Sequence, residues 1–156
     1  MTPPEANERS LVEIWFKIEK DHDGYPESKD WEGLLTSREG EHFKIESVPF
    51  YLKNVSRGDV VEARTGQFLE YVRVVRRGGS NTYRLLLKRR HEDDPEFTIN
   101  ELTLKGLQVE QEHGILLAVD VPPSVDQPAI DAFLIREKEK GRWEMQDGYV
   151  HGVGSE

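Results

Sequence analysis

The chain has 156 residues, a formal net charge of -9 and no cysteine. This length suits one domain, or two small ones sharing a core, and the absence of cysteine excludes disulfides and thiol chemistry. No apolar run approaches the roughly 18 residues that a membrane helix needs. Residues 1–10 are polar and are predicted to be a disordered lead-in rather than a signal peptide, and 151–156 to be a tail. We therefore expect a soluble, cytoplasmic protein.

The first part of the chain, residues 11–77, is predicted to be rich in strands. Residues 11–19 alternate between apolar and charged positions, as a half-buried strand does; the apolar set is Val12, Ile14, Phe16 and Ile18. Further strands are predicted at 31–37, 42–47, 60–64 and 68–76, with a short apolar patch at 50–52. Short strands with turns at even spacing are typical of a small barrel or a strongly bent sheet.

Gly78, Gly79, Ser80 and Asn81 form the clearest break in the pattern, and we expect a second subdomain over residues 81–150. Strands are predicted at 82–88, 107–111, 115–121 and 142–146. The run at 113–123, apolar between a glycine turn and two prolines, is typical of a central buried strand.

Two helices are predicted between these strands. The first is capped either by Asp94 with Pro95 at the first helical position, or by a later capping box of Thr98 and Glu101. The second runs from a cap at Ser124 or Asp126 to residue 140. The resulting order, β-α-β-β-α-β, predicts a ferredoxin-like subdomain. The whole chain is therefore predicted to be α+β.

One large class of ferredoxin-like domains binds RNA by stacking bases on aromatic residues of the central strands. Here the two central strands, 83–87 and 115–119, offer one aromatic residue and are otherwise mainly aliphatic. Aliphatic faces indicate a covered sheet, packed on the N-terminal subdomain or on a second copy of the chain.

Seven short segments together resemble an uncharacterised bacterial family, domain of unknown function 4265. They are WFKI at 15–18, DGYP at 23–26, VPF at 48–50, GDVVEA at 58–63, SNTYR at 80–84, LAVDVP at 117–122 and GRWE at 141–144. The resemblance spans about residues 11–148 and implies a small bacterial cytoplasmic protein, with no activity or catalytic residue to carry over. The chain departs from the family pattern at the acidic insert 91–96.

Charge is distributed unevenly and suggests a protein partner. Residues 91–156 carry 15 acidic and five basic residues. Such acidity disfavours nucleic acid and suits a basic protein, as in immunity proteins that occlude the cationic cleft of a toxin. The proposed partner-binding residues are Glu92, Asp93, Asp94, Glu96, Glu110, Glu112, Trp143 and Tyr149, with Trp31 and Tyr51 as further aromatic anchors if they are exposed.

Residues 72–90 carry seven basic and no acidic residues, which leaves an alternative open. In that alternative a nucleic acid or a phosphorylated ligand binds the basic run Arg73, Arg76, Arg77, Arg84, Lys88, Arg89 and Arg90. The simpler interpretation is that these residues face outward from adjacent strands and pair with acidic neighbours.

No catalytic or metal-binding motif is present in the sequence. Residues 21–26 resemble the start of a calcium loop, but Tyr25 and Pro26 occupy positions where an EF-hand needs an oxygen ligand and a glycine. The five histidines have no metal-ligand spacing, and no nucleophile elbow is found. We therefore predict no enzyme activity, no metal and no cofactor.

Overall fold

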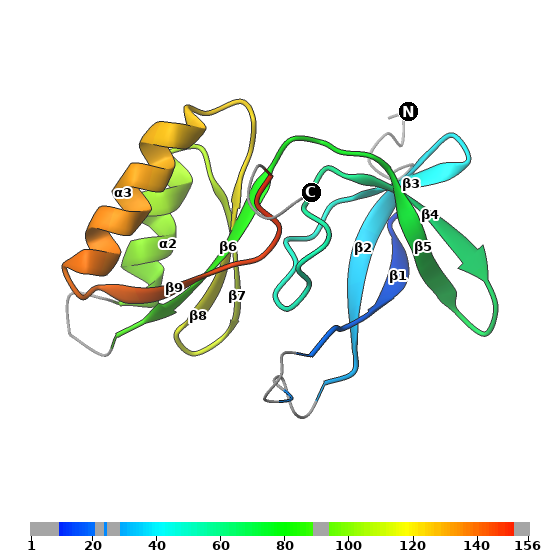
Figure 1. The fold of residues 1–156 in the computed structure, drawn as a ribbon, viewed down its shortest axis with the longest axis horizontal. Coiled ribbons are helices and arrows are strands. Elements are labelled where there is room, and N and C mark those ends of the chain that lie inside the picture. The colour runs from blue at the N-terminus through cyan, green and yellow to red at the C-terminus, as the bar shows by residue number, and fades with distance from the viewer. Residues whose placement is uncertain (1–9, 21–23, 25–28, 89–93, 152–156) are drawn as a thin grey trace, which may run out of the picture.

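The structure is a computed structural model that describes residues 10–20, 24, 29–88 and 94–151. Within these residues it has nine strands and two helices, arranged as a closed barrel and a four-stranded sheet with helices on one side (Figure 1). Neighbouring strands are antiparallel apart from one parallel bridge that closes the barrel. The predicted α+β class is confirmed.

The barrel contains the strands β1 (Val12–Lys17), β2 (Trp31–Glu39), β3 (His42–Ile45), β4 (Val60–Thr65) and β5 (Leu69–Arg76). Its core follows the alternation seen in the sequence, because Ile14, Phe16 and Ile18 are all buried. The parallel bridge joins Trp15 of β1 to Glu70 of β5.

The sheet contains β6 (Asn81–Leu87), β7 (Gln108–His113), β8 (Leu116–Val121) and β9 (Trp143–Asp147) in the order β7-β8-β6-β9. Helices α2 (Pro95–Leu104) and α3 (Gln127–Glu139) lie on the face away from the barrel (Figure 1). Leu102 and Leu134 from these helices join the sheet residues of one buried core.

The helix caps settle two alternatives that the sequence left open. Asp94 caps α2, with Pro95 at the start of the helix, and its carboxylate accepts the backbone N–H of Phe97 at 3.4 Å. Asp126 caps α3 and accepts the N–H of Ala129 at 3.2 Å. Neither helix of the described residues is long and apolar enough to cross a bilayer.

Only one face of the sheet is aliphatic. Leu117, Val119 and Val121 of β8 point to the helices, whereas Asp120, between them, points to the barrel side, as the two-residue period of a strand requires. Arg84 of β6 is also buried on that side. The expectation of aliphatic sheet faces therefore holds for the helical side, whereas the side facing the N-terminal half carries charged residues together with Leu86 and Leu116.

The segment between β3 and β4, residues 46–59, connects the barrel to the barrel-facing side of the sheet through hydrogen bonds. Arg84 donates to the backbone carbonyl of Phe50. The backbone N–H of Val48 donates to Glu110 of β7 at 3.1 Å. The apolar patch 50–52 is part of this segment and adds no strand to the barrel, but Tyr51 and Leu52 are buried in the barrel core.

Candidate functional site

A pocket of about 350 Å³ opens where β1 and β2 of the barrel meet β7 of the sheet. We call it the acidic pocket, because four glutamates and four aromatic residues line it. The glutamates are Glu13, Glu32, Glu110 and Glu112, and the aromatic residues are Trp15, Trp31, Phe50 and Tyr51. Among the lining residues that the structure describes, Lys29 is the one cation.

Three strands place the glutamates around the pocket. Glu13 and Glu32 lie on the paired strands β1 and β2. Glu110 and Glu112 lie on β7, and both line the pocket although a bulge interrupts the strand between Gln111 and His113. Gly33 pairs with Trp15, and a Cβ atom there would lie 2.6 Å from the Glu13 carboxylate and 3.0 Å from the Trp15 ring. The glycine thus makes room for both side chains.

Glu32 and Glu110 hold the segment 46–59 in place. Glu32 accepts the backbone N–H groups of Phe50 at 2.7 Å and Tyr51 at 2.9 Å. Burial raises the pKa of Glu32, the two N–H groups lower it in part, and the charge of Glu112 raises it further. Burial also raises the pKa of Glu110, against the opposing effect of the Val48 N–H. The charges of Arg84 and Arg57 already lower the pKa of Glu32 and of Glu110, respectively, and a further cation beside either carboxylate would act in the same direction.

Lys29 shows how a cation sits in the acidic pocket. Its ammonium lies 3.6 Å from a carboxylate oxygen of Glu112 and 5.7 Å from the ring centre of Tyr51. The ion pair and the cation–π contact are the two interactions that an acidic, aromatic site offers to lysine or arginine.

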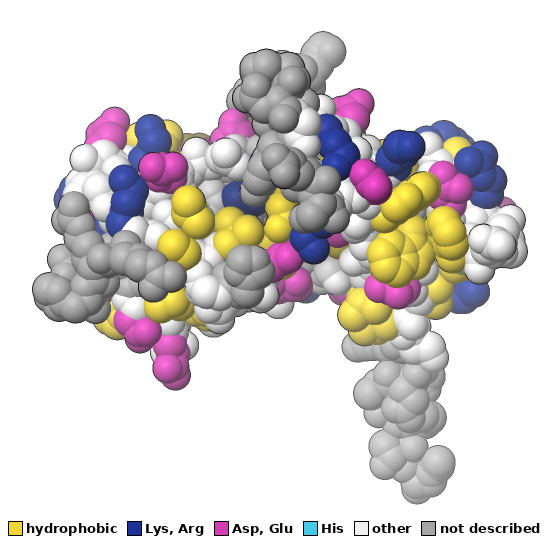
Figure 2. Space-filling model, turned by 90° about the horizontal axis from the view of Figure 1, so that it is seen from below, with side chains coloured by type: hydrophobic (Ala, Val, Ile, Leu, Met, Phe, Trp, Pro, Cys, Tyr) yellow, Lys and Arg dark blue, Asp and Glu magenta, His cyan; other side chains and the backbone are white. Residues whose placement is uncertain are grey.

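An exposed aromatic group extends the pocket over the barrel surface. The Phe68 ring lies 6.4 Å from that of Trp15 and 5.6 Å from that of Trp31, both edge to face. Trp31 is 36% exposed and Phe68 is 42% exposed. Figure 2 shows hydrophobic side chains gathered on the barrel half of the visible face, with acidic ones beside them.

The other acidic residues proposed to bind a partner lie away from this pocket. Asp94 caps α2 and Glu96 is exposed in its first turn. Glu92 and Asp93 lie outside the described residues. Of the acidic residues predicted to bind a partner, Glu110 and Glu112 on β7 line the acidic pocket.

The aromatic residues proposed as anchors need one correction. Trp143 is 1% exposed, and its indole N–H donates to the Leu134 carbonyl at 3.2 Å. It belongs to the core between the sheet and α3, so it cannot contact a partner on the surface. Tyr149 is half-buried, with the guanidinium of Arg77 4.0 Å from its ring centre. Tyr51 is mostly buried and lines the acidic pocket.

The basic run is divided between the two halves of the molecule. Its members on or next to barrel strands pair with acidic side chains, at 2.7 Å for Arg73 with Glu62, 2.7 Å for Arg76 with Glu39 and 2.9 Å for Arg77 with Asp59. Lys88, after β6, lies 3.7 Å from Glu144. Arg84 is buried and donates to Gln146 and Phe50. Arg89 and Arg90 lie outside the described residues.

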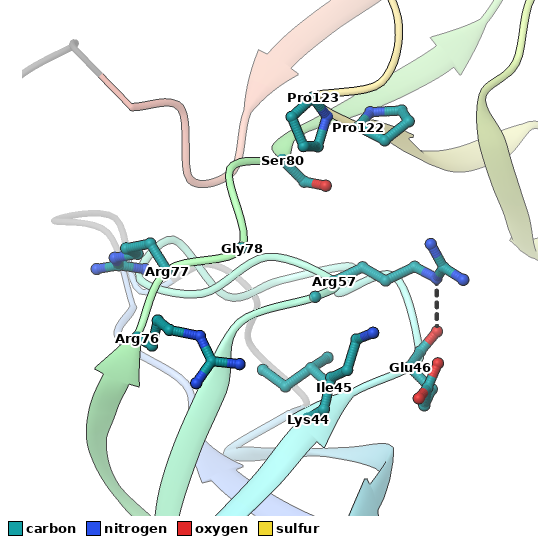
Figure 3. Close-up of a pocket in the computed structure, with 11 residues that line it drawn as sticks. Lys44, Ile45, Glu46, Arg57, Arg76, Arg77, Gly78, Ser80, Pro122 and Pro123 are labelled. Carbon is teal, nitrogen blue, oxygen red and sulfur yellow. Dashed lines mark hydrogen bonds between the residues drawn. The ribbon is translucent and has the colours of Figure 1, made fainter. Parts of the chain in front are cut away.

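A second pocket, of about 400 Å³, lies at the other side of the junction (Figure 3). We call it the basic pocket. Arg76 and Arg77 from the basic run line it together with Lys44 and Arg57. Sequence reasoning missed Lys44, Arg57, Glu13 and Glu32. They lie far apart in the chain, and the signal available was their outward position on alternating strands.

The described residues contain no group of three or more side chains suited to hold a metal ion. The fold and its pockets define an α+β protein with two polar pockets between a barrel and a helix-covered sheet. The model of the family "Domain of unknown function (DUF4265)" matches residues 32–145, and the chain belongs to this family.

A solved structure, described as a novel crystal structure of a hypothetical protein from Neisseria gonorrhoeae, is similar to this chain. It has 16% sequence identity and a TM-score of 0.71, and the match covers 89% of this chain and 94% of that one. At this identity the likeness shows the fold alone. No curated protein matches the chain.

Proposed function

We propose that the protein is a cytoplasmic protein-binding module that docks a basic protein partner at the acidic pocket. The specific form we propose is an immunity protein that occludes the active cleft of a basic toxin. The observation that carries the proposal is the acidic pocket itself, where four glutamates and four aromatic residues surround a single described cation.

The chemistry of the pocket suits an arginine or lysine side chain from a partner. Glu32 and Glu110 have raised pKa values because they are buried, so a neighbouring cation is stabilised there more than at an exposed carboxylate. Trp31 and Phe68 provide exposed aromatic surface beside it, of the kind that supplies binding hot spots. The net charge of -9 would speed the encounter with a basic protein.

The arrangement of the second half supports a finer description of the fold. We infer that residues 81–150 form a ferredoxin-like unit, because they have the order β-α-β-β-α-β and the antiparallel strand order β7-β8-β6-β9. We propose that this unit acts as a scaffold for β7, which carries Glu110 and Glu112, and has no catalytic role.

The test is affinity capture from a lysate of the source cell, followed by calorimetry with the purified captured protein. The double variant Glu13→Gln/Glu112→Gln removes two carboxylates from the pocket and leaves Glu32 and Glu110 to hold the segment 46–59. We expect it to bind the basic partner at least about tenfold more weakly than the wild type, since each charged contact is worth about 1–3 kcal/mol.

The matched control is Glu41→Gln/Glu139→Gln, which makes the same charge change at two exposed glutamates outside the pocket. It should lower affinity less than about twofold. Equal weakening by both double variants would assign binding to net charge and refute the role of the pocket. The proposed function would be refuted if the wild type captures no basic protein, or none whose capture is lost in the pocket variant.

A further inference from the structure

The walls of the basic pocket come from both halves of the molecule. Lys44 lies on β3, Arg57 precedes β4, Arg76 ends β5 and Arg77 follows it. In the view of Figure 3, the Lys44 side chain rises between those of Arg76 and Arg57, and Ser80 and two prolines lie across from them. Four cationic side chains from three segments therefore border one concave site.

The cations keep hydrogen-bond donors for a ligand. Arg57 uses Nε to donate to the Glu46 carbonyl at 2.9 Å, and its Nη1 lies 3.7 Å from Asp120. Arg76 uses Nη2 to bind Glu39. A guanidinium has five N–H donors, so each contact leaves others available. The Lys44 ammonium is exposed and forms no hydrogen bond or ion pair within the part of the chain that the structure describes.

Backbone packing makes the pocket narrow. A Cβ atom on Gly78 would lie 2.5 Å from the carbonyl oxygen of Gly58, so the two lining loops touch without a side chain between them. Pro122 and Pro123, which follow β8, form part of the opposite wall, and their rings restrict its backbone conformation. A volume of about 400 Å³ lies within the usual range for small-molecule sites.

Behind the pocket lies a buried carboxylate that positions Arg57. Asp120 is 0% exposed, and neither of its oxygens has a hydrogen bond within the described residues. Arg57 is its ion-pair partner, across the junction between β8 and the barrel. The ion pair with Asp120 limits the conformational freedom of the Arg57 guanidinium and orients it to bind an anion.

We propose that the basic pocket binds a small molecule through a phosphate group. Lys44, Arg57 and Arg76 supply charge-assisted hydrogen bonds to the phosphate oxygens, and Arg77 adds charge at the edge of the site. This site is separate from the acidic pocket, so it does not depend on a protein partner. Its ligand is a phosphorylated small molecule, because a concave site of about 400 Å³ has the size of a small-molecule site.

The test is titration of the ¹⁵N-labelled full chain with inorganic phosphate and with pyrophosphate, at fixed pH and with chloride added to constant ionic strength. We expect saturable shifts of the backbone signals of Gly58, Gly78 and Ser80, and none at Glu32 or Glu110. Lys44→Met should weaken binding about tenfold, the loss expected for one charge-assisted contact.

The matched control is Lys53→Met, which removes an exposed lysine outside the basic pocket and should leave the affinity within about twofold. Equal weakening by both variants, or shifts that follow chloride as well as phosphate, would overturn the proposal. Tighter binding of a single-stranded oligonucleotide, with shifts spread along β5, would also overturn it in favour of a nucleic-acid surface. Circular dichroism of each variant confirms that the fold is kept.

Discussion

Replacing Asp120 by asparagine is expected to stabilise the protein at neutral pH. Asp120 is fully buried, and burial raises its pKa from 3.8 to about 6, although Ser80 and Arg57 lower it and Asp59 raises it further. Above that pH the folded protein holds a charge that the unfolded chain accommodates more easily in water. Asparagine has nearly the same size and carries no charge.

The magnitude follows from the pKa difference of about two units, each worth about 1.4 kcal/mol, or roughly 3 kcal/mol in total. The pKa of about 6 already includes the favourable interaction with Arg57, so the loss of that ion pair is not subtracted a second time. We therefore expect Asp120→Asn to increase the free energy of unfolding by about 3 kcal/mol at pH 7.5.

Urea unfolding at pH 7.5, 6 and 4 tests both the size and the sign of this change in the free energy of unfolding. Because the folded pKa of Asp120 is the higher one, the folded state binds its proton first as pH falls through about 6. The difference in free energy of unfolding between Asp120→Asn and the wild type should therefore have its full size above about pH 6 and be absent near pH 4. Other titrating groups are common to both proteins and cancel in the difference. A variant that is less stable at pH 7.5 would refute the reasoning and show that the pair with Arg57 outweighs burial.

Three further substitutions test the fold by urea unfolding. Trp143→Phe should lower the free energy of unfolding by about 2 kcal/mol, because it leaves a cavity and removes the indole hydrogen bond to the Leu134 carbonyl. Gly78→Ala should lower it by about 2 kcal/mol, since a methyl group meets the Gly58 backbone. Trp31→Ala should change it by less than about 1 kcal/mol because the ring is partly exposed, and a larger loss would mean that Trp31 is a core residue.

Local patterns in the sequence were sufficient to predict the strands and helices. The alternation through Ile14, Phe16 and Ile18 predicts the buried face of β1, because a strand has a fixed two-residue period. Asp94 and Asp126 predict the helix starts, because an N-cap acts on the two or three residues that follow it. Trp143 was proposed as a surface anchor, although its spacing from Met145 already indicated an inward face of β9.

The acidic pocket was less accessible to sequence reasoning. Glu110 and Glu112 were proposed for their charge, which a single sequence displays directly. Their meeting with Glu13 and Glu32 depends on how β7 lies against the barrel, and that is decided by packing between segments about 80 residues apart. The same limit applies to Lys44 and the basic pocket.

The contact between Gly58 and Gly78 has a consequence for the kinetics of association. The chain passes from β5 to β6 in this short stretch, and the loop before β4 is pressed against it with no side chain between them. A hinge needs residues that can absorb large changes in backbone angles, and a junction packed this closely opposes such changes. A ligand at either pocket would thus meet walls already in position, so little conformational entropy would be lost on binding. Association would then be governed by diffusion and charge rather than by a slow rearrangement.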